Sequence, residues 1–249
     1  MLTILPVKGL PDITKGDNIG KLIVSRLKGE GESILQGDIV VVSQKIVSKA
    51  EGRMVSLKGV KPSPFALEIA KETEKDPRHV EMILRESKKI IRMKNGHLIT
   101  ETRHGFVCAN AGIDMSNVGR SGDSVTLLPL DPDKSAGSVR SSIRHQTGQD
   151  VPTIITDTFG RAWRIGQVNF AIGVSGLKPI RDYRGSKDMY NSVLHVTEIA
   201  IADELASAAE LVMNKADKVP VAIVRGYRFR KGNGTGRELI RPEEFDLFR

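Results

Sequence analysis

The chain has 249 residues, 39% hydrophobic and 27% charged, an ordinary balance for a globular protein with a sizeable core. No apolar run approaches the ~20 residues of a membrane-spanning helix, and the first ten residues do not read as a signal peptide. The only cysteine, Cys108, cannot form an internal disulfide, and its apolar neighbours predict a small buried side chain. We therefore expect a cytoplasmic protein with no membrane partner.

The net charge of +8 favours an anionic ligand, which could be nucleic acid or a small polyanion. Basic residues are spread along the chain, and aromatic residues make up only 4% of it, so few platforms exist for stacking single-stranded bases. The composition favours nucleotides and other small anions over nucleic acid.

Short strands and helices alternate along the chain, without internal repeats. Asp76 followed by Pro77 predicts a helix start, and Asn95-Gly96 predicts a tight hairpin turn. In chain order we expect a helix over 18–27, a buried strand over 38–43, helices over 64–71 and 77–88, a hairpin over 89–93 and 97–102, a strand over 124–128, a helix between Asp131 and Gly148, strands over 153–156, 169–174 and 219–224, and between the last two a helix over 195–214.

This order predicts an α/β (α+β) fold with mixed sheets and flanking helices. The glycine-rich stretch 232–237 lacks the spacing of a P-loop or of a Rossmann fingerprint, so we interpret it as a mobile loop that could close over a ligand. We expect residues 1–249 to form one unit of two subdomains, with a boundary near residue 89 and a return near 180.

The stretch 153–164 is the strongest candidate for a site. A β-branched run leads into Asp157 and Thr158, then Gly160, and Arg161 and Arg164 follow. A carboxylate and a hydroxyl at a strand end can bind a hard divalent cation, and arginines match phosphate or carboxylate groups. The alternative is a strand end with a turn and solvated charges.

A second carboxylate, Asp114, also follows a predicted strand, with Asn117 nearby. If Asp114 and Asp157 converge, they would make a two-carboxylate metal site that nucleotide phosphates complete, as Mg²⁺ and Mn²⁺ prefer. The alternative is a turn in which Asp114 and Asn117 cap backbone groups.

Lysines and serines follow the first buried strand in the segment Ser43 to Lys49, which includes Lys45 and Ser48. Lysine charges and serine donors suit a triphosphate, and a solvated strand end is the alternative. On the helix over 195–214, we expect a buried stripe of Ile201, Leu205, Ala208 and Val212. Asp203 and Glu210 lie about 10 Å apart along that helix, so they cannot share one ion, and we expect Asp203 to be a surface charge.

Covalent hydrolytic chemistry is disfavoured. The five histidines are scattered without zinc-ligand spacing, and no nucleophile elbow or Cys/His pair is evident.

Together these segments resemble one family, the GTP-dependent coenzyme F-420 gamma-glutamyl ligases. The resemblance runs from Leu10 to the last residues. It is carried by V-V-V-S-Q-K-I-V-S-K-A-E-G-R from Val40, N-A-G-I-D-M-S-N from Asn110, L-P-L-D-P-D-K-S-A from Leu128, D-T-F-G-R-A-W-R-I-G-Q from Asp157, A-I-G-V-S-G-L from Ala171 and A-D-E-L-A-S-A-A-E-L-V-M from Ala202. Thr158 stands where a serine is common, which keeps a hydroxyl, and Asn191 and Asn214 replace frequent glycines.

The resemblance implies an intertwined two-domain homodimer that joins L-glutamate to the lactyl carboxylate of a deazaflavin coenzyme precursor. A second glutamate is then added through a gamma linkage. GTP is cleaved to GDP and phosphate, with Mg²⁺ or Mn²⁺, two per site, and a stimulating K⁺. An acyl phosphate is the expected intermediate, because phosphoryl transfer activates a carboxylate without a protein nucleophile.

The resemblance also implies roles for individual residues. Asp114, Asp157 and Thr158 would hold divalent metal, and Asp114, Asp157 and Arg161 would take part in catalysis. GTP would be contacted by Leu10, Pro11, Asp12, Ile13, Ser43, Lys45, Lys49 and Asn117. For glutamate we consider Arg140, Arg144, Arg161 and Arg164 first, and then Arg225 and Arg237. The rivals are another nucleotide-dependent ligase and a basic RNA-binding protein.

Overall fold

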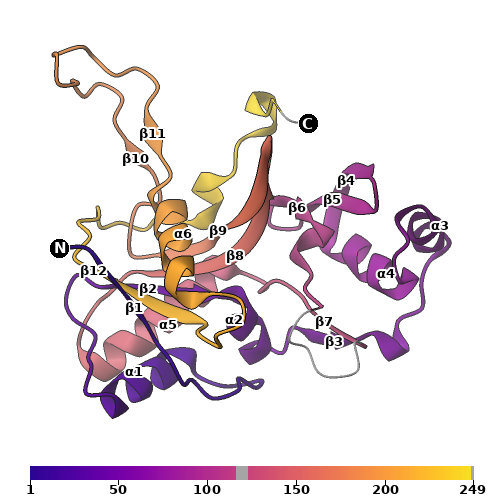
Figure 1. Cartoon of the computed structure of the whole chain (residues 1–249), viewed down its shortest axis with the longest axis horizontal. Coiled ribbons are helices and arrows are strands. Elements are labelled where there is room, and N and C mark those ends of the chain that lie inside the picture. The colour runs from indigo at the N-terminus through magenta and orange to yellow at the C-terminus, as the bar shows by residue number, and fades with distance from the viewer. Residues whose placement is uncertain (116–122, 248–249) are drawn as a thin grey trace.

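A computed structural model describes residues 1–115 and 123–247, and it has an α+β fold (Figure 1). At its centre lies a five-stranded mixed sheet in the order β1-β12-β2-β8-β9. The strands are β1 (Thr3–Pro6), β12 (Val221–Arg225), β2 (Ile39–Ser43), β8 (Thr153–Arg161) and β9 (Arg164–Ser175). β2 and β8 are parallel, and the other neighbours in this sheet are antiparallel. The expected fold class is confirmed.

Helices cover both faces of the central sheet. On one face, α1 (Ile19–Gly29), α2 (Gln44–Ala50) and α5 (Pro132–Thr147) enclose a core that includes Ile23 and Ile155. On the other, α6 (Ile201–Met213) packs on a second core that includes Ile154 and Leu205. Because neighbouring strand residues point to opposite faces, Ile154 and Ile155 belong to different cores. Cys108 is buried as predicted.

A third core lies beside the central sheet, towards the right of Figure 1. It is built by α3 (Pro64–Thr73), α4 (Pro77–Glu86) and three small elements before and after them, β3 (Met54–Ser56), η1 (Leu57–Gly59) and β7 (Ser124–Thr126). A three-stranded sheet of β4 (Ser87–Lys94), β5 (His97–Thr102) and β6 (Val107–Ala109) adjoins it, followed by η2 (Asn110–Gly112). The division into subdomains near residues 89 and 180 stays a prediction.

Local signals predicted two helix starts and one turn correctly, whereas the helix expected over 77–88 ends at Glu86 and the strand expected over 124–128 ends at Thr126. Asp76 accepts a hydrogen bond from the Arg78 backbone N–H at the start of α4, and Asp131 does the same for Lys134 at the start of α5. Asn95 and Gly96, with φ of 50° and 73°, form the turn between β4 and β5. These two left-handed residues give the twist that a two-residue hairpin turn requires.

Two expected elements differ from the structure, and one alternative that we left open is excluded. β8 does not end at Asp157 with a turn at Gly160, because it runs on to Arg161 paired with β9, and the turn includes Trp163 at φ 62°. The helix expected over 195–214 begins at Ile201, and its buried side chains include Ala206, Ala209 and Met213 in place of Ala208 and Val212. The segment after β2 is the helix α2, not a solvated strand end.

The residues before α6 form an arm that leaves the body of the molecule (Figure 1). Its base is the pair β10 (Arg181–Asp182) and β11 (Glu198–Ile199), and every residue from 184 to 193 is exposed. η3 (Gly236–Leu239) and η4 (Glu243–Phe245) follow β12. Over residues 1–115 and 123–247, the structure contains no helix that is both long and apolar enough to cross a membrane.

Candidate functional site

The candidate site begins where β2 ends beside β8. Ser43, the last residue of β2, pairs with Thr156, so Asp157 and Thr158 are the first residues of β8 beyond that end. Helix α2 starts immediately after Ser43 and carries Lys45 and Lys49 one turn apart on one face. Two lysines, a carboxylate and a hydroxyl therefore lie around the carboxyl end of β2 and the part of β8 beyond it.

Asp114 reaches this place from the third core. Before it, Asn110, Ala111 and Gly112 are all left-handed, with φ of 53°, 54° and 68°. Asp114 then forms an isolated bridge with Thr126, and its carboxylate lies 2.6 Å from the Lys45 ammonium. Left-handed backbone at a buried alanine such as Ala111 is strained, and such strain gathers at functional sites.

The structure brings Asp114 and Asp157 close enough for their charges to interact. Burial raises the pKa of Asp157 to about 6, and the negative charge of Asp114 adds to this rise. The backbone N–H of Thr158 and the lysines Lys45 and Lys215 act in the opposite direction on the same pKa. A buried carboxylate with a second carboxylate nearby is stabilised by a cation placed between them.

Thr158 faces the other side of the sheet. Across the β8–β9 pair Asp157 is opposite Phe170, whereas Thr158 is opposite Asn169, and neighbouring strand residues point to opposite faces. The Thr158 hydroxyl donates to Asn169 Oδ1 over 2.7 Å and accepts a hydrogen bond from Lys215 Nζ. Asp157 and Thr158 therefore belong to two different polar clusters, one on each face of the sheet.

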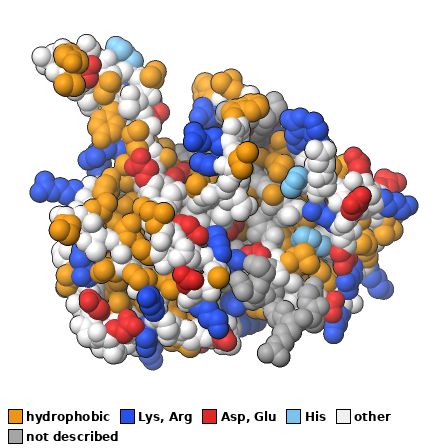
Figure 2. Space-filling model, in the orientation of Figure 1, with side chains coloured by type: hydrophobic (Ala, Val, Ile, Leu, Met, Phe, Trp, Pro, Cys, Tyr) orange, Lys and Arg blue, Asp and Glu red, His pale blue; other side chains and the backbone are white. Residues whose placement is uncertain are grey.

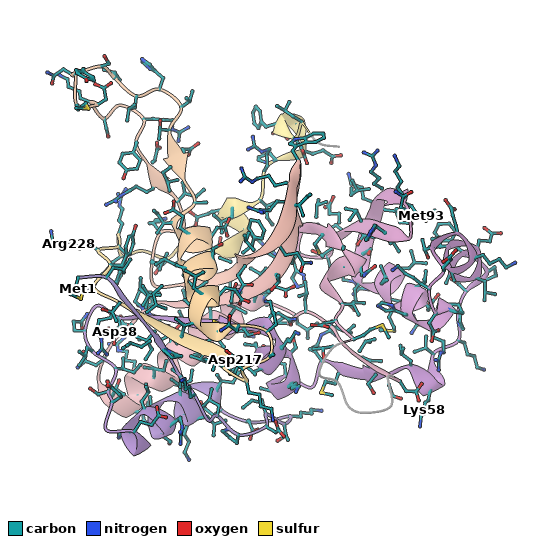
Figure 3. The ribbon with its side chains drawn as sticks, viewed as in Figure 1. Met1, Asp38, Lys58, Met93, Asp217 and Arg228 are labelled. Carbon is teal, nitrogen blue, oxygen red and sulfur yellow. The ribbon has the colours of Figure 1, made fainter. Side chains whose placement is uncertain are left out.

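Lys215 completes this second cluster from the connection after α6, which Figure 3 marks by Asp217. Its ammonium lies 3.1 Å from Glu210 Oε1 and 3.3 Å from Asn169 Oδ1. The amide of Asn169 donates to the other Glu210 oxygen over 3.0 Å. Three oxygens from β8, β9 and α6 therefore surround one positive charge.

The residues predicted to contact GTP lie on separate elements. Leu10, Pro11, Asp12 and Ile13 form the loop between β1 and α1, where Pro11 and Asp12 are exposed and Ile13 is buried. The same loop contacts the end of α2 through the Gly16 N–H and the Ala50 carbonyl, 2.8 Å apart. Asn117 lies outside the described residues. Its role and the roles of Ser43 and Lys49 stay predictions.

The arginines considered for glutamate are not gathered at one place. Arg140 forms a two-bond ion pair with Asp150, at 2.7 and 2.8 Å. Arg144 is exposed further along α5. Arg161 is four residues beyond Asp157 at the end of β8, about 13 Å along the strand, and Arg164 begins β9.

Of the other two arginines, Arg225 has a structural partner and Arg237 is exposed, and the glycine-rich stretch is packed against the sheet. Arg225 pairs with the buried Asp38 at 2.8 Å, and Arg237 lies in η3. The stretch 232–237 is not a free loop: its Gly236 N–H donates to Asp133 over 2.7 Å, and a Cβ at Gly236 would lie 2.5 Å from the Ile172 carbonyl oxygen. Glycine is needed there for close packing against β9.

Asp203 is not the surface charge that we expected. It is half-buried on α6 and accepts a hydrogen bond from the Ala171 N–H over 2.8 Å, which satisfies the free edge of β9. Burial raises the pKa of Asp203 to about 6.

Oxygen ligands suited to hard divalent cations are present at the site. Among residues 1–115 and 123–247, no group of three His, Cys, Asp or Glu side chains could hold a metal ion alone. Asp114 and Asp157 are a pair, so an ion held there needs further oxygens. Nucleotide phosphates are the natural source of them, because Mg²⁺ is often bound by one or two carboxylates plus substrate phosphates.

The profile of the family described as F420-0:Gamma-glutamyl ligase matches residues 9–226. The chain belongs to this family. A relative from Methanothermobacter thermautotrophicus named Coenzyme F420:L-glutamate ligase is 49% identical, covering 100% of this chain and 99% of the relative. Relatives of the same name from Methanocaldococcus jannaschii and Methanopyrus kandleri are 48% and 44% identical, covering 87% and 100% of this chain and 86% and 98% of those relatives.

In this member of the gamma-glutamyl ligase family, sequence reasoning found Asp114, Asp157 and Lys45 but missed Lys215 and Asn169. Asn169 pairs with Thr158 across a hairpin, so an alternating reading of both strands could have found it. Lys215 stands 57 residues from Thr158, beyond the end of a helix, and no local pattern connects them.

Proposed function

We propose that this chain is a GTP-dependent ligase that adds L-glutamate to the deazaflavin precursor of coenzyme F420. The lactyl carboxylate accepts the first glutamate, and a gamma linkage joins the second. Membership of the ligase family supports the reaction class. The observation that carries the proposal is the meeting of Asp114, Asp157 and Lys45 at the end of β2.

The reaction needs a leaving group on the acceptor carboxylate. A carboxylate oxygen attacks the γ-phosphorus of GTP, the bond to the bridging oxygen breaks, and GDP leaves. The glutamate amine then attacks the acyl carbon, the phosphate leaves with its bonding electrons, and the amine loses a proton. No protein nucleophile is needed, in agreement with the buried, hydrogen-bonded character of Cys108, whose pKa burial raises to about 12.

The chain supplies charge and position for these steps. Asp114 and Asp157 would hold one divalent cation, Mg²⁺ or Mn²⁺, and the Thr158 side would hold the second. When bound, such ions neutralise the charge that develops on the transferred phosphoryl group. Lys45 and Lys49 on α2 would contact the GTP phosphates, with the loop Leu10 to Ile13 beside the nucleotide. Arg161 and a K⁺ ion would add further positive charge.

Asp114→Ala and Asp157→Ala test this function. Each should lower GDP release with glutamate and precursor by more than about a hundredfold, or ~2.7 kcal/mol. GTP with Mn²⁺ should also raise the melting temperature of each variant by less than it raises that of the wild type. Glu72→Ala, at an exposed carboxylate on α3, is the matched control and should leave both unchanged. Near-normal turnover of either aspartate variant at saturating Mn²⁺ contradicts its assignment.

The rival functions make different predictions. An RNA-binding protein should be stabilised by RNA rather than by GTP with Mn²⁺. Lys and Arg are interspersed with Asp and Glu on the face in Figure 2, as small-ligand binding favours. Another nucleotide-dependent ligase should cleave GTP with a different acceptor carboxylate. We further propose a cytoplasmic homodimer whose partners are GTP, L-glutamate and the precursor.

A further inference from the structure

A cavity of about 220 Å³ lies beside β8 and β9 and takes no part in the site described above. It opens between the start of β6 and the C-terminal segment around Ile240. Figure 1 shows that segment rising next to β8 and β9. Phe106, Phe159 and Phe170 form its apolar wall, and Asp203 and Arg241 also line it.

The three phenylalanines form a continuous cluster in which Phe159 and Phe170 are stacked and Phe106 is tilted against Phe159. The ring centroids of Phe106 and Phe159 are 6.3 Å apart, and those of Phe159 and Phe170 are 5.7 Å apart at an interplanar angle of 23°. Phe159 and Phe170 are only half-buried, so parts of their rings remain open. The whole chain has seven phenylalanines, and three of them meet here. Such a wall suits a flat aromatic ring, which stacks with offset or tilted geometry.

Polar groups lie at one side of this wall. The Asp203 carboxylate is half-buried and holds the Ala171 N–H, and it can accept a further hydrogen bond. Arg241 is exposed at the rim. A ring with its own N–H or O–H donors fits this lining better than a plain hydrocarbon ring does, because binding sites combine apolar walls with a few placed polar groups.

The cavity lies at the free edge of β9, where Asp203 of α6 lines it from one face of the sheet and the phenylalanine wall shares the other face with Asp157. Phe170 is the direct cross-strand partner of Asp157, and Phe159 follows Asp157 by two residues. Two strand residues span about 7 Å, so a chain of a few bonds attached to a ring in the cavity would reach Asp157.

We propose that this cavity binds the planar tricyclic ring of the acceptor substrate, with the carboxylate-bearing chain running along β8 to Asp114 and Asp157. The inference rests on the proposed function, since it assumes a deazaflavin acceptor. The volume of about 220 Å³ is below the ~300 Å³ at which sites for whole drug-sized ligands begin, so it suits the ring alone. The phosphodiester and the chain then lie outside, towards the basic residues.

Two variants test the ring site by different means. Phe159→Leu removes the central ring of the phenylalanine cluster. Val107→Trp adds a large side chain at an exposed strand position on the rim, where it would fill the cavity without entering the core. Phe65→Leu is the matched control, because Phe65 is an exposed phenylalanine on α3 in another part of the molecule.

Binding of the precursor is measured through its ring fluorescence, with a non-hydrolysable GTP analogue and Mn²⁺ present. We expect Kd to rise at least about tenfold in Phe159→Leu and in Val107→Trp, because stacking on an aromatic side chain is worth ~1–3 kcal/mol per ring. Kd should change less than twofold in Phe65→Leu. The stabilisation that the analogue and Mn²⁺ give without precursor should be equal in all four proteins.

The outcomes separate the ring site from the function on which it rests. If the wild type binds the precursor and both cavity variants bind it equally well, the ring lies elsewhere and the function stands. If the wild type is stabilised by the GTP analogue but does not bind the precursor, the proposed function is wrong and the ring site is wrong with it.

Discussion

At the scale of single residues, Lys215 has the most direct chemical consequence. Its ammonium occupies the oxygens of Thr158, Asn169 and Glu210 in the way that a metal ion would. In Lys215→Met the ammonium no longer competes with a metal ion for these oxygens. Nucleotide-free protein should therefore bind Mn²⁺ about tenfold more tightly than the wild type, a gain of ~1.4 kcal/mol. Calorimetric titration measures the affinity for Mn²⁺, and Lys71→Met, at an exposed lysine of α3, is the control. Unchanged or weaker Mn²⁺ binding would show that the cluster is only structural.

Thr158→Val should act in the opposite direction. It removes the hydroxyl at nearly constant shape, so the second cluster loses one oxygen while the β8–β9 pairing is kept. We expect a weaker apparent affinity for metal and a melting temperature within a few degrees of the wild type. An unaltered metal dependence would mean that Thr158 only holds Asn169 and Lys215 in place.

Asp203 should make stability depend on pH. Burial raises its pKa to about 6 from 3.8, so the native protein holds this proton more tightly than the unfolded chain does. Stability from this group is complete below pH ~4 and is lost as pH rises through ~6. Between pH 4 and 7 the free energy of unfolding should therefore fall by about 2 kcal/mol less in Asp203→Asn than in the wild type. Urea unfolding measures this difference. The pH-dependent contribution of Asp157 to stability is the same in both proteins, so it cancels in the comparison. Parallel pH profiles would contradict the assignment.

The sequence predicted these residues unevenly. Asp114 and Asp157 were each predicted to follow a strand, but Asp157 lies within β8, and Asp114 approaches it from the third core. No local pattern in the sequence contains that convergence. That Thr158 faces away from Asp157 could be read from strand alternation once β8 is extended beyond Asp157. Asp203 looked like a surface charge because its partner, the Ala171 N–H, is on the free edge of a distant strand.

At the scale of elements, the contact between α5 and β9 sets the geometry of the sheet on which the site rests. A Cβ at Gly173 would lie 2.2 Å from the Pro132 carbonyl oxygen at the start of α5. Gly173→Ala should force the helix away from β9 and lower the free energy of unfolding by about 3 kcal/mol. Gly160→Ala in β8, where a Cβ meets nothing within 4 Å, is the control and should cost almost nothing. Equal stability of the two variants in denaturant titrations would show that α5 can shift freely.

Elements with local signals were predicted and those fixed by distant partners were not. The starts of α4 and α5 and the turn at Asn95-Gly96 depend on side chains within a few residues. β8 continues past Asp157 because Val168 and Gln167 pair with Phe159 and Gly160, which the β-branched pattern alone does not contain. α6 begins late because Glu198 and Ile199 are used by the arm.

At the scale of the whole molecule, the arm over residues 183–197 leaves the body of the molecule (Figure 1), and its residues 184–193 are all exposed. Hydrophobic side chains lie on the arm in Figure 2. Met189, Tyr190 and Val196 are 85%, 79% and 86% exposed. Large exposed apolar side chains on a protruding segment are typical of interaction surfaces. A second copy of the chain is the partner that the homodimer proposal requires.

If the proposed homodimer forms through the arm, replacing Met189, Tyr190 and Val196 together with serine should give monomers. Each substitution removes an apolar contact with the partner, which contributes ~25 cal/mol for every Å² that it buries. Three such losses together should weaken the interface strongly. Light scattering across a dilution series measures the mass. Leu211→Ser, at a 76% exposed leucine on α6, is the matched control and should remain dimeric.

The melting temperature of the wild type should rise with protein concentration and that of the triple variant should not, because only the wild type gains stability by association. A triple variant that keeps the dimer mass at low micromolar concentration would place the interface away from the arm.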